Sequence, residues 1–235
     1  MAISPSQLSL FDRCSRKWAL SRTSPEPTSP EAQFGIDVHD LIPKAILGRS
    51  YATGTFSYMP DPELARILSG VLVREAVRVF HSFGFLKYET ERMIETKQVR
   101  GRIDLWGETH DGKLIVLDWK TTTRRFTDHD ARTSDQLTCY CHLIHHKLGR
   151  YPDYVCLVPL SLTEGRGYAL RTTRTSEDLT TWLDKLTKVM SAMAQGFTYR
   201  NPSACMDYGK SCVYYETCWK EQEIEVLYDD IPSLT

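Results

Sequence analysis

The sequence predicts an α/β protein, and two patterns lead to that prediction. Residues 99–123 alternate apolar and polar side chains on either side of His110-Asp111-Gly112, as expected for two β-strands joined by a tight turn. Segments with helical periodicity precede and follow this hairpin. The 235 residues suffice for one sizeable core, or for one core with an appendage.

The chain before the hairpin is predicted to be mainly helical. Ser4, Pro5 and Gln7 have the residue types of an N-cap, a first helical position and the end of a capping box. Apolar residues then continue at helical spacing as far as Trp18. The elements expected next are a loop at 23–31, helices at 33–48 and 61–84, and a strand at 87–96.

The register of the hairpin decides which of its side chains share a face. A three-residue loop with Gly112 in the left-handed conformation pairs Thr109 with Lys113. Counting outward, Asp104 then lies opposite Asp118, and opposed residues share a face of the sheet. A two-residue Asp-Gly turn would separate the two aspartates, so the prediction depends on the longer loop. The apolar residues expected on the other, core-facing side are Ile103, Leu105, Ile115, Leu117 and Trp119.

Two opposed aspartates need a reason to be close. Like charges in a cross-strand pair are destabilising, and a divalent cation between them would remove that cost. Hard oxygen ligands favour Mg²⁺ or Mn²⁺. Lys120 follows Asp118 by two residues, so it projects from the same face and could stabilise negative charge or orient a water. The alternative is a solvated hairpin with a surface Asp–Lys pair. Glu91 and Glu95 are interpreted as solvated, with extra acidic ligands as the alternative.

The second half of the chain continues the α/β pattern. Gln136 and Tyr140 are four residues apart on an expected helix at 131–148, so they share one helix face. An amide and a phenol can bond phosphate oxygens or bases without adding charge. The alternative is a core helix with Tyr140 packed inside. Strands are expected at 154–160 and 168–174, and a long helix at 175–196.

The seven cysteines suggest two different uses. Cys139, Cys141 and Cys156 fall in regular elements and are interpreted as core thiols. Cys205, Cys212 and Cys218 lie instead in a short, polar, Tyr-rich segment, where a metal or iron–sulfur centre would explain them. Zinc is the physical competitor of an iron–sulfur cluster, because thiolates also suit tetrahedral Zn²⁺.

The net charge limits the kinds of binding partner that can be expected. The formal net charge is −1, so a nucleic acid would have to be met by a local basic groove and not by a global field. No apolar run approaches the length of a membrane span and the N-terminus lacks a signal-peptide pattern, so we expect a cytoplasmic protein without a membrane partner. The groove candidates, which could also be ordinary solvated surface, are Arg13, Arg16, Lys17, Arg22, Arg124 and Arg125.

Several motifs resemble one family. The order Asp, then Asp-x-Lys, on a hairpin after Gly-Arg-Ile resembles the PD-(D/E)xK nuclease superfamily, and within it the RecB-like exonucleases. Gly35 and His39 match the Gly-x-x-x-His segment of these enzymes, and Gln136 with Tyr140 matches their Gln-x-x-x-Tyr motif. The stretch SPSQLSLFDRCSRKWAL resembles the opening helix of iron–sulfur RecB-like nucleases.

The resemblance implies a restriction-endonuclease-like domain over residues 1–235, with a central mixed β-sheet flanked by helices. It implies a metal-dependent DNA exonuclease acting on single strands or duplex ends, in recombination, repair, or phage or CRISPR DNA processing, with protein partners from such a complex. Gln136 and Tyr140 would line the cleft and contact DNA or position Lys120. The residues implied as ligands of Mg²⁺ or Mn²⁺ are His39, Asp104, Asp118 and the carbonyl of Trp119.

The resemblance also implies the fourth thiol of the cysteine cluster. Cys14 would join Cys205, Cys212 and Cys218 around a [4Fe–4S] cluster that staples residues 1–22 to residues 200–220. The tail lacks the Cys-x-x-Cys start that is commoner in these enzymes. Two other classes stay open: a non-catalytic DNA-binding or assembly module on the nuclease fold, and a zinc-stapled interaction domain.

Overall fold

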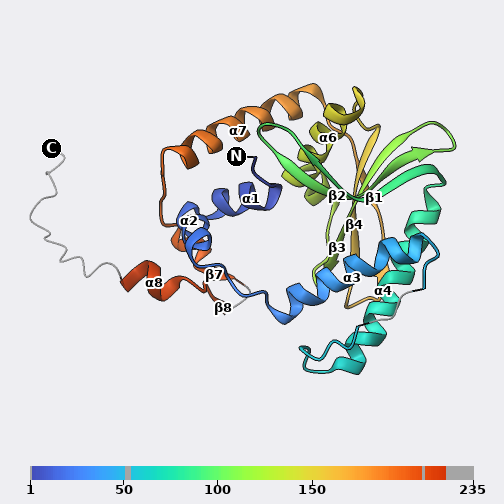
Figure 1. Ribbon diagram of the computed structural model, residues 1–235, viewed down its shortest axis with the longest axis horizontal. Coiled ribbons are helices and arrows are strands. Elements are labelled where there is room, and N and C mark those ends of the chain that lie inside the picture. The colour runs from blue at the N-terminus through green and yellow to red at the C-terminus, as the bar shows by residue number, and fades with distance from the viewer. Residues whose placement is uncertain (1, 51–53, 208–209, 221–235) are drawn as a thin grey trace, which may run out of the picture.

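A mixed β-sheet lies at the centre of the computed structural model, which describes residues 2–50, 54–207 and 210–220 (Figure 1). Its order is β1-β2-β3-β4-β5, with β6 also pairing with β4. β3 and β4 run parallel, whereas the other pairs are antiparallel. The predicted α/β class is therefore confirmed. The strands are β1 Phe85–Glu95, β2 Arg100–Thr109, β3 Leu114–Thr122, β4 Tyr154–Ser161, β5 Arg166–Gly167 and β6 Leu170–Thr172.

Helices cover both faces of this sheet (Figure 1). α3 (Pro30–Ile46) and α4 (Pro62–Ser82) pack on one face, and α6 (Asp135–Leu148) and α7 (Ser176–Ala194) pack on the other. The remaining elements are α1 Pro5–Arg13, α2 Ser15–Thr23, α5 Asp128–Arg132, the 3₁₀-helix Pro202–Ala204, β7 Met206–Asp207, β8 Lys210–Ser211 and α8 Tyr215–Lys220. In the described residues no helix is long and apolar enough to cross a membrane.

The hairpin has the predicted three-residue loop. The backbone N–H of Thr109 donates to the carbonyl of Lys113 at 3.0 Å, and Gly112 has a φ of 77°, which an L side chain rarely adopts. The ladder of β2 and β3 continues to the pair of Leu105 with Leu117. One further step in this register places Asp104 opposite Asp118, as the sequence predicts.

The core differs from the prediction, because both faces of the hairpin are buried. Ile115 and Leu117 pack with α3 and α4, whereas Leu114 and Val116 pack with α6 and α7. β3 is an interior strand with β2 on one side and β4 on the other, so each of its faces meets a helical layer. The expectation of a single core-facing side was therefore wrong.

Ile103 is a second correction. It was expected beside Leu105, yet it belongs to the cluster on the α6 and α7 face, while Leu105 belongs to the other cluster. β2 has lost its pairing with β3 at this point, and the neighbouring strand β1 carries Glu91 at a φ of 54°. The regular alternation of side chains is interrupted where β2 leaves β3, and Ile103 turns towards α6.

Two predicted helices are divided in the structure. The first breaks at Cys14, whose φ of −162° and ψ of 104° are extended, so that α1 ends and α2 begins there. The Cys14 Sγ accepts a hydrogen bond from the backbone N–H of Lys17 at 3.4 Å and caps α2. The helix expected at 131–148 is likewise divided into α5 and α6, with Ser134 as the N-cap of α6. Local capping interrupts an apolar periodicity that continues through both breaks.

The two ends of the described chain contact each other. The backbone N–H of Arg16 donates to the carbonyl of Tyr199 at 3.1 Å, and the side chain of Asn201 donates to the carbonyl of Arg13 at 2.8 Å. The Tyr214 hydroxyl donates to the carbonyl of Ser24 at 2.5 Å. Figure 1 shows α2, β7, β8 and α8 gathered beside the sheet. A closing strand expected beyond Lys220 lies outside the described residues.

Candidate active site

A cavity of about 540 Å³ opens between α3 and α6, beside the point where β2 separates from β3. Residues from five elements converge on it, because α3, β1, β2, β3 and α6 all reach this end of the sheet. It brings together most of the predicted site residues: His39, Asp104, Trp119, Lys120, Gln136 and Tyr140.

Asp104 lines this cavity, and Asp118 is buried near it without lining the cavity. Their side chains are 10% and 1% exposed. The Asp104 Oδ2 accepts a hydrogen bond from the backbone N–H of Trp119 at 2.8 Å. The Asp104 carboxylate therefore bonds the backbone of β3 where β2 and β3 separate. Burial raises the pKa of Asp104 well above its ordinary value of 3.8, and the charge of Asp118 raises it further. Burial also raises the pKa of Asp118, against the opposing effect of Lys120.

Lys120 is held between Asp118 and α6. Its Nζ lies 2.9 Å from Asp118 Oδ2 and donates to Asp118 Oδ1 at 3.1 Å and to Gln136 Oε1 at 2.8 Å. Burial alone would lower the pKa of Lys120, but the charges of Asp118 and Asp104 outweigh it and raise the pKa. Lys120 is therefore an ammonium group at neutral pH, suited to stabilising negative charge.

Gln136 and Tyr140 connect this lysine to β2. The Gln136 Nε2 donates to the Tyr140 hydroxyl at 2.7 Å, and that hydroxyl donates to the carbonyl of Arg102 at 2.8 Å. Because Gln136 Oε1 already accepts from Lys120, each polar group in this row has a partner. Tyr140 is also buried in the core cluster. Its ring packs in the core, as one interpretation expected, while its hydroxyl takes part in the row of hydrogen bonds.

His39 reaches the site from α3. Its Nδ1 lies 3.7 Å from Asp104 Oδ2. Burial lowers the pKa of His39 to about 4, with Lys120 and Arg102 adding to the effect and a hydrogen bond with the Trp119 backbone opposing it. The imidazole is consequently neutral at pH 7 and has a ring nitrogen available as an acceptor or ligand.

A comparison with known families decides the classification of this site. A family model described as the PD-(D/E)XK nuclease superfamily matches residues 2–219. The chain belongs to this superfamily. A search of curated proteins found no match. Nucleases hydrolyse phosphodiester bonds. Asp104, Asp118 and Lys120 therefore lie in a chain that is related to phosphodiester hydrolases.

One of two similar solved structures shows the same fold as this chain. A protein from Eubacterium rectale, provisionally assigned as an exonuclease, has a TM-score of 0.51 and 10% identity, and the match covers 93% of this chain and 92% of that one. A protein named SSO0001 has a TM-score of 0.43 and 15% identity, with 85% and 78% covered. The first likeness shows the fold alone.

Glu91 is a site residue that the sequence interpretation missed. It was expected to be solvated, yet it lines the cavity and its Oε1 is buried without a hydrogen-bond partner. Its Oε2 accepts from Arg102 Nε. Glu95, four residues further along β1, is exposed as expected. The register of β1 against β2 would have revealed Glu91, but no local sequence signal indicates a positive φ at a glutamate.

The acids of this site fit a divalent cation by charge. The buried Glu91 Oε1 forms no hydrogen bond and would gain a partner from a cation, whereas Asp118 Oδ2 is already paired with the Lys120 ammonium at 2.9 Å. Within residues 2–50, 54–207 and 210–220, however, no three His, Cys, Asp or Glu side chains are already arranged to hold a metal ion. The donor types fit Mg²⁺ or Mn²⁺, and the side chains would have to draw closer around it.

The four cysteines of the predicted cluster line one small cavity of about 20 Å³ between α2 and the C-terminal segment. All four are free thiols, and the backbone N–H of Cys212 donates to the carbonyl of Cys205 at 2.7 Å. Four thiols in one cavity are a donor set that suits iron or zinc. Like the acids, they are not prearranged as a metal site in the described part of the chain. These residues are Cys14, Cys205, Cys212 and Cys218.

The other three cysteines are core thiols, as predicted. Cys139, Cys141 and Cys156 are buried in the two hydrophobic clusters. Burial raises the pKa of Cys141 and of Cys156 to about 12, and it raises that of Cys139 as well. These side chains are protonated and unreactive at neutral pH.

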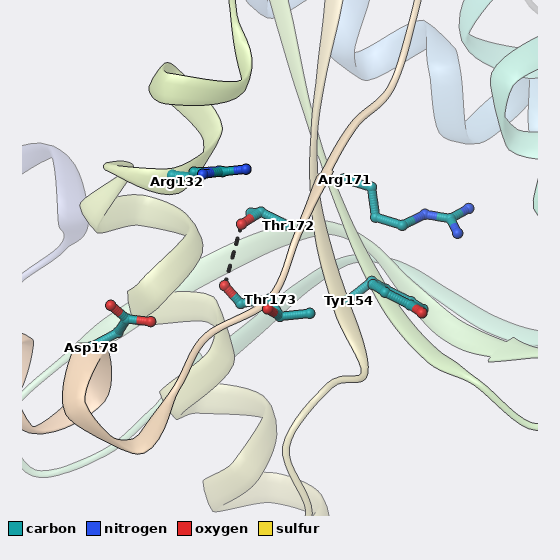
Figure 2. Close-up of a pocket in the computed structure, with 6 residues that line it drawn as sticks. All are labelled: Arg132, Tyr154, Arg171, Thr172, Thr173 and Asp178. Carbon is teal, nitrogen blue, oxygen red and sulfur yellow. Dashed lines mark hydrogen bonds between the residues drawn. The ribbon is translucent and has the colours of Figure 1, made fainter.

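A further cavity of about 410 Å³ lies at the β6 edge of the sheet (Figure 2). Figure 2 shows Arg171 and Tyr154 on one side of β6, with Arg132, Thr172 and Asp178 on the other. The Arg171 guanidinium lies 4.8 Å from the centre of the Tyr154 ring, so it is engaged in a cation–π contact. The polar groups around this cavity therefore do not converge on one point.

Proposed function

We propose that this superfamily member is a metal-dependent deoxyribonuclease of the RecB-like type, an exonuclease that hydrolyses phosphodiester bonds in single strands or at duplex ends. One observation supports this above the others: Asp104 and Asp118 are buried side by side with the ammonium of Lys120 held against them. This arrangement places negative charge where a cation is needed and positive charge where a phosphate would lie.

His39, Asp104, Asp118 and the carbonyl of Trp119 would hold Mg²⁺ or Mn²⁺. When bound, such an ion lowers the pKa of a coordinated water and neutralises the scissile phosphate. Neutral His39 offers a ring nitrogen without adding positive charge. Lys120 stabilises the negative charge that develops on the phosphate, and Gln136 fixes the position of its Nζ through the 2.8 Å hydrogen bond.

DNA is the proposed substrate, with a role in recombination, repair, or phage or CRISPR DNA processing. A basic residue lies beyond the catalytic strand, where Arg124 stacks over Phe126 at 3.9 Å from the ring centre. An arginine on an aromatic face can bind phosphate or stack with an exposed base. The provisional assignment of the Eubacterium rectale protein as an exonuclease agrees with this proposal.

A [4Fe–4S] cluster bound by Cys14, Cys205, Cys212 and Cys218 is the proposed second cofactor, with Zn²⁺ as the alternative. The shared cavity of these four thiols supports the assignment. The role would be structural, because the thiols come from the two chain ends and lie in a different cavity from Asp104 and Lys120.

The test is cleavage of single-stranded and duplex DNA by the full chain with Mg²⁺ or Mn²⁺. We expect Asp118→Ala and Lys120→Ala each to reduce the rate by about 10³-fold or more while the protein stays folded. Lys113→Ala is the matched control, because Lys113 directly precedes the same strand and its ammonium pairs with Asp153 at 3.1 Å, away from the cavity. Its activity should be unchanged.

A DNA-binding or assembly module without turnover is the second candidate. DNA binding without any cleavage in either metal would support this candidate. Cleavage that persists at the wild-type rate in both the Asp118 and the Lys120 variant would overturn the assignment of the catalytic residues.

A further inference from the structure

We propose that Glu91 supplies a third carboxylate to the cation site, in addition to those of Asp104 and Asp118. This inference rests on the proposed function, because it concerns the same cation. It adds a ligand from β1, a strand that contributes none of the residues assigned above.

The register of three adjacent strands aligns the three acids. β1 pairs Thr90 with Leu105 and Arg92 with Ile103, so Glu91 occupies the position opposite Asp104. The ladder between β2 and β3 ends at Leu105 and Leu117, and Asp104 and Asp118 are the next residue on each strand. The three carboxylates therefore occupy neighbouring positions on β1, β2 and β3, and those of Glu91 and Asp104 line the cavity.

The contacts of these acids are incomplete. Glu91 Oε1 is buried and forms no hydrogen bond, whereas the Asp118 carboxylate, 1% exposed, is paired with the Lys120 ammonium at 2.9 Å. Leaving a buried carboxylate oxygen unpaired is costly. A cation between the acids would give Glu91 Oε1 a partner, whereas a purely structural Glu91 would need only the oxygen that already bonds Arg102.

Arg102 acts as the present counter-charge of Glu91. Its guanidinium bonds Glu91 and reaches Asp40 on α3 at 3.3 Å. The Arg102 side chain is 52% exposed, so it can swing into solvent when another cation takes its place. The competing explanation is that Glu91 serves only to anchor Arg102, and the two explanations predict different effects of removing Arg102.

Calorimetric titration of the full chain with Mn²⁺ alone distinguishes a Glu91 that binds the cation from a Glu91 that only anchors Arg102. We expect Glu91→Gln to weaken Mn²⁺ binding by about 10-fold or more. Glu95→Gln, on the same strand but exposed, should bind Mn²⁺ as the wild type does. Arg102→Met should bind Mn²⁺ as tightly as the wild type or more tightly, because it removes a competing positive charge. Thermal unfolding of each variant confirms that it is folded.

Two results would overturn the inference. Wild-type Mn²⁺ affinity in Glu91→Gln would exclude Glu91 as a ligand. Equal weakening in Glu91→Gln and Arg102→Met would show that Glu91 acts only through Arg102. Both results leave the proposed nuclease intact if the wild type binds Mn²⁺ and cleaves DNA. A wild type that neither binds Mn²⁺ nor cleaves would reject both proposals together.

Discussion

At the scale of single residues, Asp104 is the carboxylate whose negative charge is most disfavoured by its surroundings in this site. It is buried, it lies opposite one acid on each neighbouring strand, and its pKa is raised by burial and by the charges of Asp118 and Glu91. The folded protein therefore holds the Asp104 proton more tightly than the unfolded chain does. Above the ordinary value of 3.8, the free energy of unfolding of the metal-free protein falls as pH rises towards the raised pKa.

Asp104→Asn should therefore stabilise the metal-free protein while it removes activity. The amide keeps an oxygen that can accept the Trp119 N–H but carries no charge. Relief of cross-strand repulsion, roughly 1 kcal/mol, corresponds to a rise in Tm of about 2–4 °C at neutral pH. The advantage over the wild type should grow as pH rises above 3.8, the ordinary pKa of Asp104, in thermal unfolding with chelator.

Asp153→Asn is the control with the opposite sign. The hydrogen bond from the Leu114 backbone lowers the pKa of Asp153, with Lys113 adding to it, so this charge stabilises the folded state above the ordinary pKa. The control should lower Tm at neutral pH. An Asp104→Asn protein that melts at or below the wild-type temperature would contradict the proposed conflict of charges.

Gln136 is a positioning residue, since it touches Lys120 and not the reacting atoms. Gln136→Ala should lower kcat by about 10- to 100-fold with a much smaller change in KM, because the Lys120 ammonium loses its fixed place. Gln33→Ala is the control, because the Gln33 side chain donates to Asp37 on the same helix and does not line the cavity. A large rise in KM at constant kcat would instead assign Gln136 to substrate binding.

At the scale of elements, the close approach of β1 to β2 depends on Gly107. A Cβ at this position would lie 2.2 Å from the carbonyl oxygen of Lys87, so the backbone of β1 would have to move. Gly107→Ala should lower the free energy of unfolding by about 1–3 kcal/mol, measured by chemical denaturation. Gly54→Ala, with no atom within 4 Å of the added Cβ, should be nearly neutral. Equal stabilities would refute the steric role.

The elements also show what a sequence can and cannot predict. His110-Asp111-Gly112 has turn chemistry with few solutions, so the register and the meeting of Asp104 with Asp118 followed from it. Gln136 and Tyr140 followed from helical spacing. The break at Cys14 did not, because apolar periodicity runs through it. The place of Glu91 depends on the pairing of distant strands and on a positive φ, and neither leaves a local pattern.

At the scale of the whole molecule, Cys14 has two roles, as the N-cap of α2 and as a proposed metal ligand, and a pair of substitutions can separate them. Cys14→Ser keeps a good N-cap for α2 but removes a thiolate, whereas Cys14→Ala removes both. We expect both variants to lose bound iron or zinc, measured by metal analysis and visible absorption after anaerobic purification. Both should melt below the metal-loaded wild type, and Cys14→Ala should melt lower than Cys14→Ser because α2 also loses its N-cap. Full metal content in Cys14→Ser would remove Cys14 from the ligand set.

The contact between the chain ends has a consequence for synthesis. Residues 2–24 are synthesised before the strands of the sheet, and their partners Tyr199, Asn201 and Tyr214 are synthesised after them. Strands β1 to β4 can pair while translation continues, so Asp104 and Asp118 are assembled before the thiol pocket closes. Any inorganic group held in that pocket would enter after the sheet has formed, and a chain that terminates before Tyr199 would carry the acids without the contacts that close the pocket.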